Sequence, residues 1–334
     1  IPVDFYRAKR DCNGVNLGIG QHKNLSESGH EDKTCYMILQ KSIRGAKSLL
    51  SFSPQRCTIL SLPADCGMTV EVNPNMCLLI FAHQVDPRYP LVLAANRDEF
   101  HARPTAPSTF WPEYSQLLAG RDLEQGGTWM GITRQGRFAA ITNYRDPART
   151  TPAPRSRGEL PLAYLTGEED PRVFLQGLVD SAADYAGFNL LVGTLDKLWY
   201  LTNSTAAKGC APVPLKPGVY GLSNAQLDTP WPKVELGKRS LEALLQGEAL
   251  DHDTLAGVVG NRDLADQGAL QRQGLDQGMD QILSAQFITT GSYGTRSSTA
   301  LWADQTGGVH WRECSFNSDG ERSGAREETF DLES

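Results

Sequence analysis

The chain has 334 residues, and its 40% hydrophobic and 8% aromatic content is enough to build the core of one large or two ordinary domains. Its longest apolar runs, such as residues 77–82 and 91–95, are of strand length and fall short of the ~20 residues that cross a bilayer. The sequence therefore predicts a soluble globular protein with no membrane span.

Charge is distributed unevenly along the chain. Residues 1–76 carry nine Lys or Arg and seven Asp or Glu. Subtraction from the totals of 32 and 39 leaves 23 and 32 for residues 77–334, a net charge of −9. An acidic domain of this kind is not expected to bind nucleic acid.

The seven cysteines show neither CxxC pairs nor zinc-ligand spacing, and the histidines show no metal-binding spacing either. An odd number of widely spaced cysteines favours a reducing compartment. We therefore expect a cytoplasmic protein with no metal and no cofactor. The sequence gives no indication of its oligomeric state.

Residues 1–75 differ in pattern from the rest of the chain, because they lack clear strand or helix periodicity before residue 36. Three interpretations compete: a targeting peptide, a pro-segment removed ahead of Cys77, and translated sequence upstream of a true start at Met76. We favour the third, and treat residues 1–75 as an extension and residues 76–334 as a single domain. A chain that starts at Met76 and loses that methionine would begin with Cys77.

From Met76 onward the apolar pattern is regular, and it indicates strands in hairpins with helices between them. Strands are expected at residues 76–83, 91–99, 129–133, 137–143, 188–203 (a pair with a turn near Asp196), 287–290, 299–304 and 309–314. Helices are expected at residues 159–166, 171–185, 231–245 and 254–265, with a polar loop at 266–281. This order predicts an α+β protein with antiparallel sheets, not a βαβ dinucleotide-binding fold.

Cys77 opens the first predicted strand. A lone cysteine on an apolar strand is usually a small buried hydrophobic residue. If Cys77 were the first residue of the chain, however, its α-amine would lie beside its own thiol and could serve as a base, since an α-amino pKa of ~7.7–8.0 is close to neutrality. One residue would then supply both nucleophile and base.

The segment Asn96-Arg97-Asp98-Glu99 follows the apolar part of the second strand, next to the head of its hairpin partner. In one interpretation it is a charged turn in solvent, whose ion pairs contribute little energy. In the other, Arg97 favours the thiolate of Cys77 and lowers its pKa, while Asp98 accepts hydrogen bonds from the α-ammonium group.

Two asparagines, Asn143 and Asn224, stand at predicted strand ends. Asparagine there is most often a turn former, yet its amide is also a neutral donor suited to an oxyanion. Residues 294–299, with the sequence GTRSST, are predicted to form a flexible polar loop that lacks the spacing of a phosphate-binding loop.

Together these motifs resemble the NRDE family, whose animal members are called transport and Golgi organization protein 2. The resemblance rests on MCLLIF, LAANRDEF, GGTWMGI, ITNY, RGEL, GFNLL, YGLSNAQLDTPW and YGTRSSTAL, and it covers residues 76–334. In that family the chain starts at the methionine before the cysteine. The resemblance thus implies a start at Met76.

A more distant resemblance connects the order of these residues with N-terminal-nucleophile hydrolases of the penicillin V acylase and bile salt hydrolase type. It implies an αββα sandwich and hydrolysis of an amide bond. Its implied roles are Cys77 as nucleophile and base, Arg97 and Asp98 as positioning partners, Asn143 and Asn224 as oxyanion donors, and Arg296 as organiser of the pocket. The adjacent pair Arg97-Asp98 departs from the spaced pair of those hydrolases.

The predicted function is hydrolysis of a C–N amide bond in a small acylated molecule. The alternative is a non-catalytic protein that binds and traffics haem or acyl-CoA and lipids, because the NRDE family has been linked to both. A carrier of that kind would use apolar pocket walls, with Trp129, Phe188 and Trp231 as candidates.

Overall fold

The computed structural model describes residues 77–145, 153–204, 210–247, 249–275 and 279–333 in full, and the backbone of six short strands ahead of them. The chain divides into two compact units, Ile1–Pro74 and Asn75–Ser334. In the first unit, four strands form an antiparallel sheet in the order β1 (Val15–Gln21), β4 (Cys35–Lys41), β5 (Ser48–Ser53), β6 (Arg56–Leu60). The strands β2 (Asn24–Leu25) and β3 (Glu31–Asp32) pair with each other.

The second unit contains two antiparallel sheets, here called sheet I and sheet II. The strand order of sheet I is β16 (Gly218–Leu222), β7 (Cys77–Asp86), β8 (Tyr89–Phe100), β17 (Tyr293–Ala303), β18 (Gly308–Phe316), β19 (Arg322–Asp331). The strand order of sheet II is β15 (Val213–Pro214), β14 (Lys197–Thr202), β13 (Phe188–Thr194), β12 (Arg137–Asn143), β11 (Met130–Thr133), β10 (Tyr114–Asp122), β9 (Thr105–Trp111).

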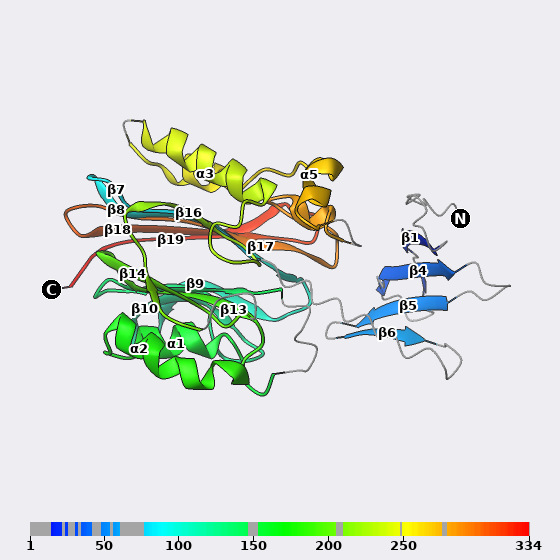
Figure 1. The fold of residues 1–334 in the computed structure, drawn as a ribbon, viewed down its shortest axis with the longest axis horizontal. Coiled ribbons are helices and arrows are strands. Elements are labelled where there is room, and N and C mark those ends of the chain that lie inside the picture. The colour runs from blue at the N-terminus through cyan, green and yellow to red at the C-terminus, as the bar shows by residue number, and fades with distance from the viewer. Residues whose placement is uncertain are drawn as a thin grey trace. The chain divides into compact units, whose positions relative to one another are not determined.

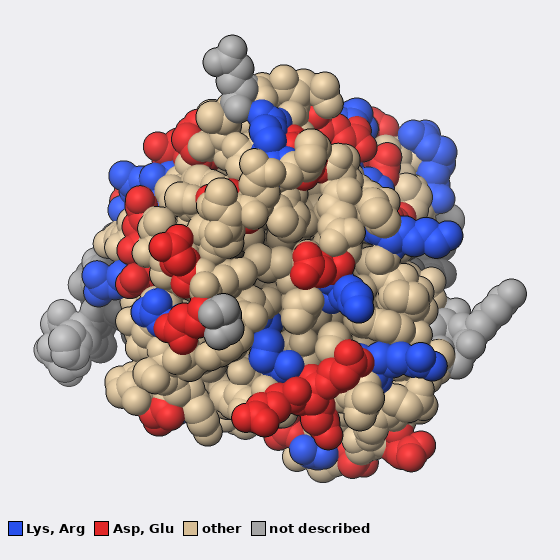
Figure 2. Space-filling model, turned by 90° about the vertical axis from the view of Figure 1, so that its left-hand side faces the viewer, with Lys and Arg blue, Asp and Glu red and all other residues tan. Residues whose placement is uncertain are grey.

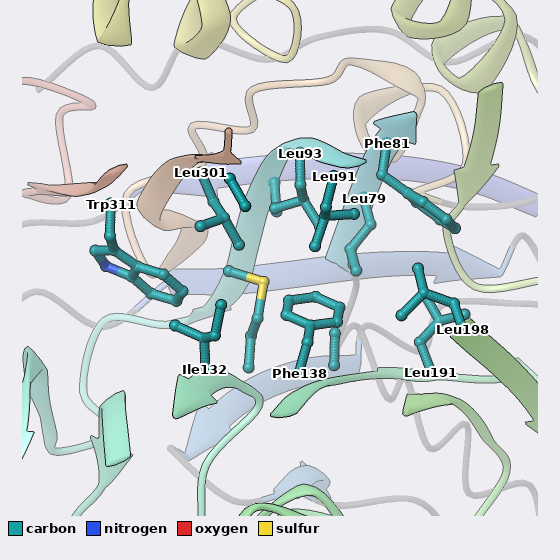
Figure 3. Close-up of a cluster of buried hydrophobic side chains, with 14 of the residues drawn as sticks. Leu79, Phe81, Leu91, Leu93, Ile132, Phe138, Leu191, Leu198, Leu301 and Trp311 are labelled. Carbon is teal, nitrogen blue, oxygen red and sulfur yellow. The ribbon is translucent and has the colours of Figure 1, made fainter. Parts of the chain in front are cut away.

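The two sheets pack face to face through one apolar cluster (Figure 3). Leu79, Phe81 and Leu93 from sheet I meet Phe138 and Leu191 from sheet II. All five are at most 1% exposed. Each such side chain contributes about 1.5–3 kcal/mol through removal of apolar surface from water, so this layer is a main source of stability.

Helices cover the outer faces of both sheets, which gives four layers in the order α, β, β, α (Figure 1). The helices α3 (Pro232–Leu245) and α4 (His252–Gly257) pack on sheet I, while α1 (Glu159–Thr166) and α2 (Pro171–Leu178) pack on sheet II. The predicted αββα sandwich with antiparallel sheets is confirmed. None of the helices in the described part of the chain is long and apolar enough to cross a membrane.

The position of strand β7 explains why residues 77–82 form a continuous apolar run. Leu79 and Phe81 face sheet II, whereas Leu78 and Ile80 face the helices. A strand covered on both faces has no polar alternation. Helix α3 lies unusually near, because a Cβ atom on its Gly237 would come within 2.6 Å of Ile80.

Several expectations for local structure were wrong or incomplete. The predicted helix 171–185 ends at Leu178 as α2 and continues as a tighter 3₁₀ helix, η1 (Val179–Asp184). The helix expected at 254–265 is the shorter α4, which starts at His252 and ends at Gly257. It starts there because the Asp251 side chain caps it, accepting hydrogen bonds from the backbone N–H groups of Asp253 and Thr254.

The predicted loop 266–281 contains the helix α5 (Gln267–Arg272), which the Asp266 side chain caps by accepting a hydrogen bond from the Ala269 N–H. A short 3₁₀ helix, η2 (Ile282–Ser284), follows. Residues 287–290 form no strand beyond an isolated bridge at Thr289. The strand pair β9 and β10 was not predicted. The edge strand β19 was not predicted either, because it is mostly exposed and its sequence lacks the alternation of apolar and polar residues that marks a half-buried strand.

Charged side chains of both signs lie among one another on the end of the sandwich that carries the C-terminus (Figure 2). In the β7–β8 turn, for example, the Arg88 guanidinium contacts the Asp86 carboxylate at 2.6 Å. Because both signs are mixed, this end of the sandwich carries no large field of a single sign.

Candidate active site

A cavity of about 560 Å³ opens where β7 begins, and strands of both sheets contribute to its wall. Its lining includes Cys77 from β7, Arg97 and Asp98 from β8, Asn143 from the end of β12, and Arg296 from β17. Five of the six residues predicted for the site therefore share one cavity. The sixth, Asn224, is 1% exposed and is not part of the lining, but its Nδ2 donates a 2.8 Å hydrogen bond to the carbonyl oxygen of Asn143.

Cys77 sits in register with Arg97 across the β7–β8 pair. Its side chain is 9% exposed, and its carbonyl oxygen accepts a 2.9 Å hydrogen bond from the Ser223 hydroxyl. The Ser223 carbonyl in turn accepts a 2.6 Å hydrogen bond from the Thr142 hydroxyl on sheet II. The start of β7 is thus held by hydrogen bonds that reach both sheets.

Within the chain, the pKa of the Cys77 thiol lies above its ordinary value. Burial raises the pKa of Cys77 to about 12, and the negative charge of Asp98 adds to the shift, while the Arg97 guanidinium opposes it. Desolvation of the thiolate outweighs the single favourable charge. This value belongs to a chain in which the nitrogen of Cys77 is an uncharged peptide nitrogen.

Asp98 is a buried carboxyl group with one oxygen engaged. Its Oδ1 accepts a 2.6 Å hydrogen bond from the Thr295 hydroxyl, and Thr295 is its register partner on β17. Its Oδ2 is buried and has no hydrogen-bond partner within the described residues. Burial raises the pKa of Asp98 to about 6, and the positive charge of Lys233 opposes that rise.

Lys233 lies in the first turn of α3 and was missed in the sequence, where it reads as an ordinary surface lysine of a helix. It is 3% exposed, and its Nζ donates a 3.0 Å hydrogen bond to the carbonyl oxygen of Leu283. Burial lowers the pKa of Lys233 to about 8, and the charge of Asp98 opposes that shift. The buried ammonium group of Lys233 therefore interacts electrostatically with the carboxyl group of Asp98.

The interpretation of residues 96–99 as a charged turn in solvent is wrong, because these residues belong to β8 and three of them are buried. The Asn96 amide donates hydrogen bonds to two backbone carbonyls on the helical side, which is a structural role. Glu99 lies 3.8 Å from the guanidinium groups of both Arg97 and Arg103. The segment divides its side chains between the two faces of the sheet, as a strand must.

Residues 294–299, predicted to be a flexible loop, lie within β17. The register with β8 shifts between Thr295 and Ser297, so Arg296 is the extra residue of a β-bulge. Its guanidinium donates to the carbonyl oxygens of Phe100 and Arg103, at 2.8 and 2.9 Å, and to the Thr105 hydroxyl at 3.1 Å. Arg296 thus fixes the connection between β8 and β9 at the cavity.

Two further charged residues of the cavity were not foreseen. Glu313 on β18 is 4% exposed, burial raises its pKa, and its Oε1 accepts a 2.8 Å hydrogen bond from the Ser108 N–H. Arg157 precedes α1 in the motif RGEL, which was noted only as part of the resemblance. Glu313 and Arg157 are both far from Cys77 in the sequence. Only the fold brings these two residues to the cavity, so no local pattern could have predicted them.

The three aromatic residues suggested as walls of a carrier's pocket do not share a cavity. Trp129 lines the cavity at Cys77. Phe188 is buried between sheet II and its helices, and Trp231 packs in the cluster between sheet I and α3.

These features define an α+β sandwich protein in which a cysteine opens a central strand at the wall of a polar cavity. Residues 76–318 match the model of the family described as Transport and Golgi organisation 2, and the chain belongs to this family. The family predicted from the motifs is thereby confirmed.

The chain is 38% identical over 264 residues to the Transport and Golgi organization 2 homolog of Mus musculus, which covers 72% of this chain and 93% of that protein. It is 39% identical over 265 residues to the homolog of Bos taurus, with the same shares. Among solved structures, it is similar to a mutant of the conjugated bile acid hydrolase from Clostridium perfringens at 10% identity and a TM-score of 0.35, over 77% of this chain and 97% of that one.

Proposed function

We propose that this protein hydrolyses the C–N amide bond of a small acylated molecule, with Cys77 as an N-terminal nucleophile. The observation that carries the proposal is the unpartnered Oδ2 of Asp98, a buried carboxyl oxygen beside the cysteine. A buried carboxylate oxygen without a donor is costly, and an α-ammonium group at Cys77 is a cation of the right size to satisfy it.

The proposal requires a free α-amine at Cys77, produced by initiation at Met76 and methionine removal or by cleavage of a pro-segment. An amide nitrogen after Met76 has no available lone pair and cannot act as a base. An ammonium group beside the thiol would also lower the thiol pKa from the value near 12 that Cys77 has within the chain.

In the proposed reaction, the α-amine takes the thiol proton and the thiolate attacks the carbonyl carbon of the amide. The C–N bond of the tetrahedral intermediate then breaks, and the α-ammonium group gives its proton to the leaving amine. Water attacks the resulting thioester after losing a proton to the α-amine. The carboxylic acid leaves, and the proton returns to Sγ.

The other predicted residues take supporting roles in this proposal. Arg97, opposite Cys77, favours the thiolate, and Asp98 orients the α-amine. Asn143, which lines the cavity, is the proposed oxyanion donor, and one such donor is typically worth ~10²–10³ in rate. Asn224, predicted as a second donor, lies outside the cavity lining, and in this proposal it positions Asn143 through the hydrogen bond to its carbonyl oxygen. Arg296 positions the cavity wall through its backbone contacts.

We also propose a cytoplasmic location, based on the odd number and wide spacing of the cysteines.

The test compares a protein that begins at Cys77 with one that carries a single alanine ahead of it. Both are incubated with N-acyl amides of varied chain length, and product formation and intact mass are followed. We expect turnover and an acyl adduct at Cys77 only with the free α-amine, and loss of most turnover in Cys77→Ser. Equal turnover by the alanine-extended protein, or no adduct with any substrate, would refute the proposal. Tight binding of haem or a long-chain acyl-CoA by an adduct-free Cys77→Ala variant would instead indicate a carrier.

A further inference from the structure

Two sequence motifs on separate elements meet backbone to backbone at the cavity. In GGTWMG, a Cβ atom on Gly127 would lie 2.5 Å from the carbonyl carbon of Gly158 in RGEL. The Thr128 N–H donates a 3.1 Å hydrogen bond to the carbonyl oxygen of Gly158. Only glycine permits this close approach. The contact holds Gly158 in place, and Arg157, which directly precedes Gly158, is thereby fixed at the cavity wall.

The Arg157 guanidinium is anchored from the other side as well. Its Nη1 donates a 3.0 Å hydrogen bond to the carbonyl oxygen of Gly187, which also accepts a 2.8 Å hydrogen bond from the Tyr144 N–H. Gly187 directly precedes β13 and Tyr144 directly follows β12, so Arg157 lies at the paired ends of these strands, next to Asn143. Its guanidinium is within electrostatic reach of Cys77.

The other arginines that line the cavity already have partners. Four contact carboxylates, in the pairs Arg97–Glu99, Arg103–Asp122, Arg121–Glu113 and Arg155–Glu159. Arg296 directs its donors at two backbone carbonyls and a hydroxyl group. Among the described residues, Arg157 contacts no carboxylate at ion-pair distance and makes one side-chain hydrogen bond.

Arg157 is therefore a partly buried cation that no described carboxylate meets at ion-pair distance. Burial lowers the pKa of Arg157 to about 10, and the negative charge of Glu99 offsets the shift only in part. A desolvated guanidinium costs stability unless an anion meets its planar set of donors. In a cavity of about 560 Å³, that anion can come with a ligand.

We propose that Arg157 forms an anion subsite in the cavity and binds a carboxylate or phosphate group of the molecule whose amide bond Cys77 cleaves. The inference rests on the proposed function for the identity of the ligand as an amide substrate. The subsite itself follows from Arg157 and its surroundings. The preferred substrates are anionic acyl amides, and matched neutral amides bind more weakly.

Binding is measured by calorimetry in the Cys77→Ala protein, which forms no acyl adduct. The carboxylate arm compares N-octanoylglycine with its neutral glycinamide, and the phosphate arm compares N-octanoyl-O-phosphoethanolamine with neutral N-octanoylethanolamine. We expect the anionic member of at least one pair to bind about 10- to 100-fold more tightly, as for one charge-assisted contact. The arm with the larger ratio identifies the anion.

Arg157→Gln in this background should reduce that ratio to below about 3-fold. The matched control, Arg326→Gln, removes the same charge from an exposed position on β19 and should leave the ratio unchanged. Equal affinity within both pairs, no binding of either anionic probe, or an equal effect of both variants overturns the subsite. Absence of turnover in the Cys77-initiated protein bears on the hydrolase alone, because the binding ratio does not depend on turnover.

A second measurement does not require a folded Arg157 variant. Phenylglyoxal modifies accessible guanidinium groups, and peptide mapping reports each site separately. The anionic probe should slow modification of Arg157 in the otherwise unchanged protein by about 10-fold at saturation, without affecting Arg326. Unchanged modification of Arg157 at saturating probe overturns the proposal.

Discussion

Cys77 and Arg97 face each other as register partners on β7 and β8, yet the thiol pKa lies near 12. One guanidinium does not offset burial together with the adjacent carboxylate of Asp98. The Cys77 thiol is therefore protonated near neutral pH while its nitrogen remains within a peptide bond. In the proposed mechanism, an α-ammonium group at Cys77 supplies a second positive charge beside the thiol.

Thiol labelling tests this relationship directly. In the full chain, Cys77 should react with iodoacetamide at pH 7.4 far more slowly than half-buried Cys210, because a pKa near 12 leaves roughly 10³-fold less thiolate than a free cysteine near ~8.5. In a protein that begins at Cys77, the reaction should speed up by about 10- to 1,000-fold, the effect of an opposite charge in contact. Labelled peptides are quantified by mass spectrometry. Rapid labelling of Cys77 in the full chain would contradict the buried environment.

The sequence could locate much of the site because its signals are local. Cys77, Arg97 and Asp98 belong to one hairpin, whose apolar pattern and turn residues are visible in a short window. Lys233 and Arg157 are different. Lys233 acts on Asp98 electrostatically from a helix more than a hundred residues later. The role of Arg157 depends on a backbone contact between two motifs that are distant in the sequence.

Arg296 offers a test of the cavity wall. Its three hydrogen bonds tie the bulge of β17 to residues 100–105, and a lysine ammonium cannot reproduce the planar guanidinium fork. Arg296→Lys should lower the free energy of unfolding by about 1–3 kcal/mol. It should also accelerate amide hydrogen exchange at residues 100–105. Arg326→Lys on exposed β19 serves as the control, and identical exchange in both variants would count against the proposed anchor.

Gly127 and Gly177 form a matched pair of glycines for testing the motif contact. Alanine at Gly127 would place its Cβ 2.5 Å from backbone atoms of Gly158, so either the β10–β11 connection or the turn before α1 must move. We expect Gly127→Ala to cost about 1–3 kcal/mol in unfolding free energy, as overpacking does. Gly177→Ala in helix α2 meets nothing within 4 Å and should stabilise the protein by about 0.5–1 kcal/mol. Urea unfolding measures both changes.

The fold could be predicted as far as its strands show periodicity. The hairpins β7–β8, β11–β12 and β13–β14 carry compact apolar runs, and all three are present. The polar edge strand β19 has no such pattern, because only Phe330 of its ten residues is buried. Residues 294–299 look like a loop for a related reason: their hydroxyl groups are buried by partners such as Asp98, which a single segment does not reveal.

The pH dependence of stability tests the environment of Asp98. Its pKa of about 6 in the folded protein exceeds the ~3.9 of an unfolded aspartate, so the native state binds the proton more tightly. The resulting stabilisation is fully present below about pH 4 and is lost as the pH rises through about 6. The total loss is about 3 kcal/mol, from roughly two pKa units. Asp98→Asn removes this dependence.

Urea unfolding at pH 4, 5, 6 and 7 therefore compares the unchanged protein with Asp98→Asn. The stability of the variant relative to the unchanged protein should rise by up to about 3 kcal/mol between pH 4 and pH 7. Lys233, with a pKa of about 8, stays charged in the unchanged protein over this window. Because Asp98→Asn removes the charge that opposes the lowering of this pKa, the slopes are compared between pH 4 and pH 6. The control, Asp331→Asn, removes a carboxyl group exposed on β19 and should leave the slope unaltered. Parallel curves for the unchanged protein and Asp98→Asn would show that Asp98 ionises as it does in the unfolded chain, and would remove the buried carboxyl group on which the proposed role for the α-amine depends.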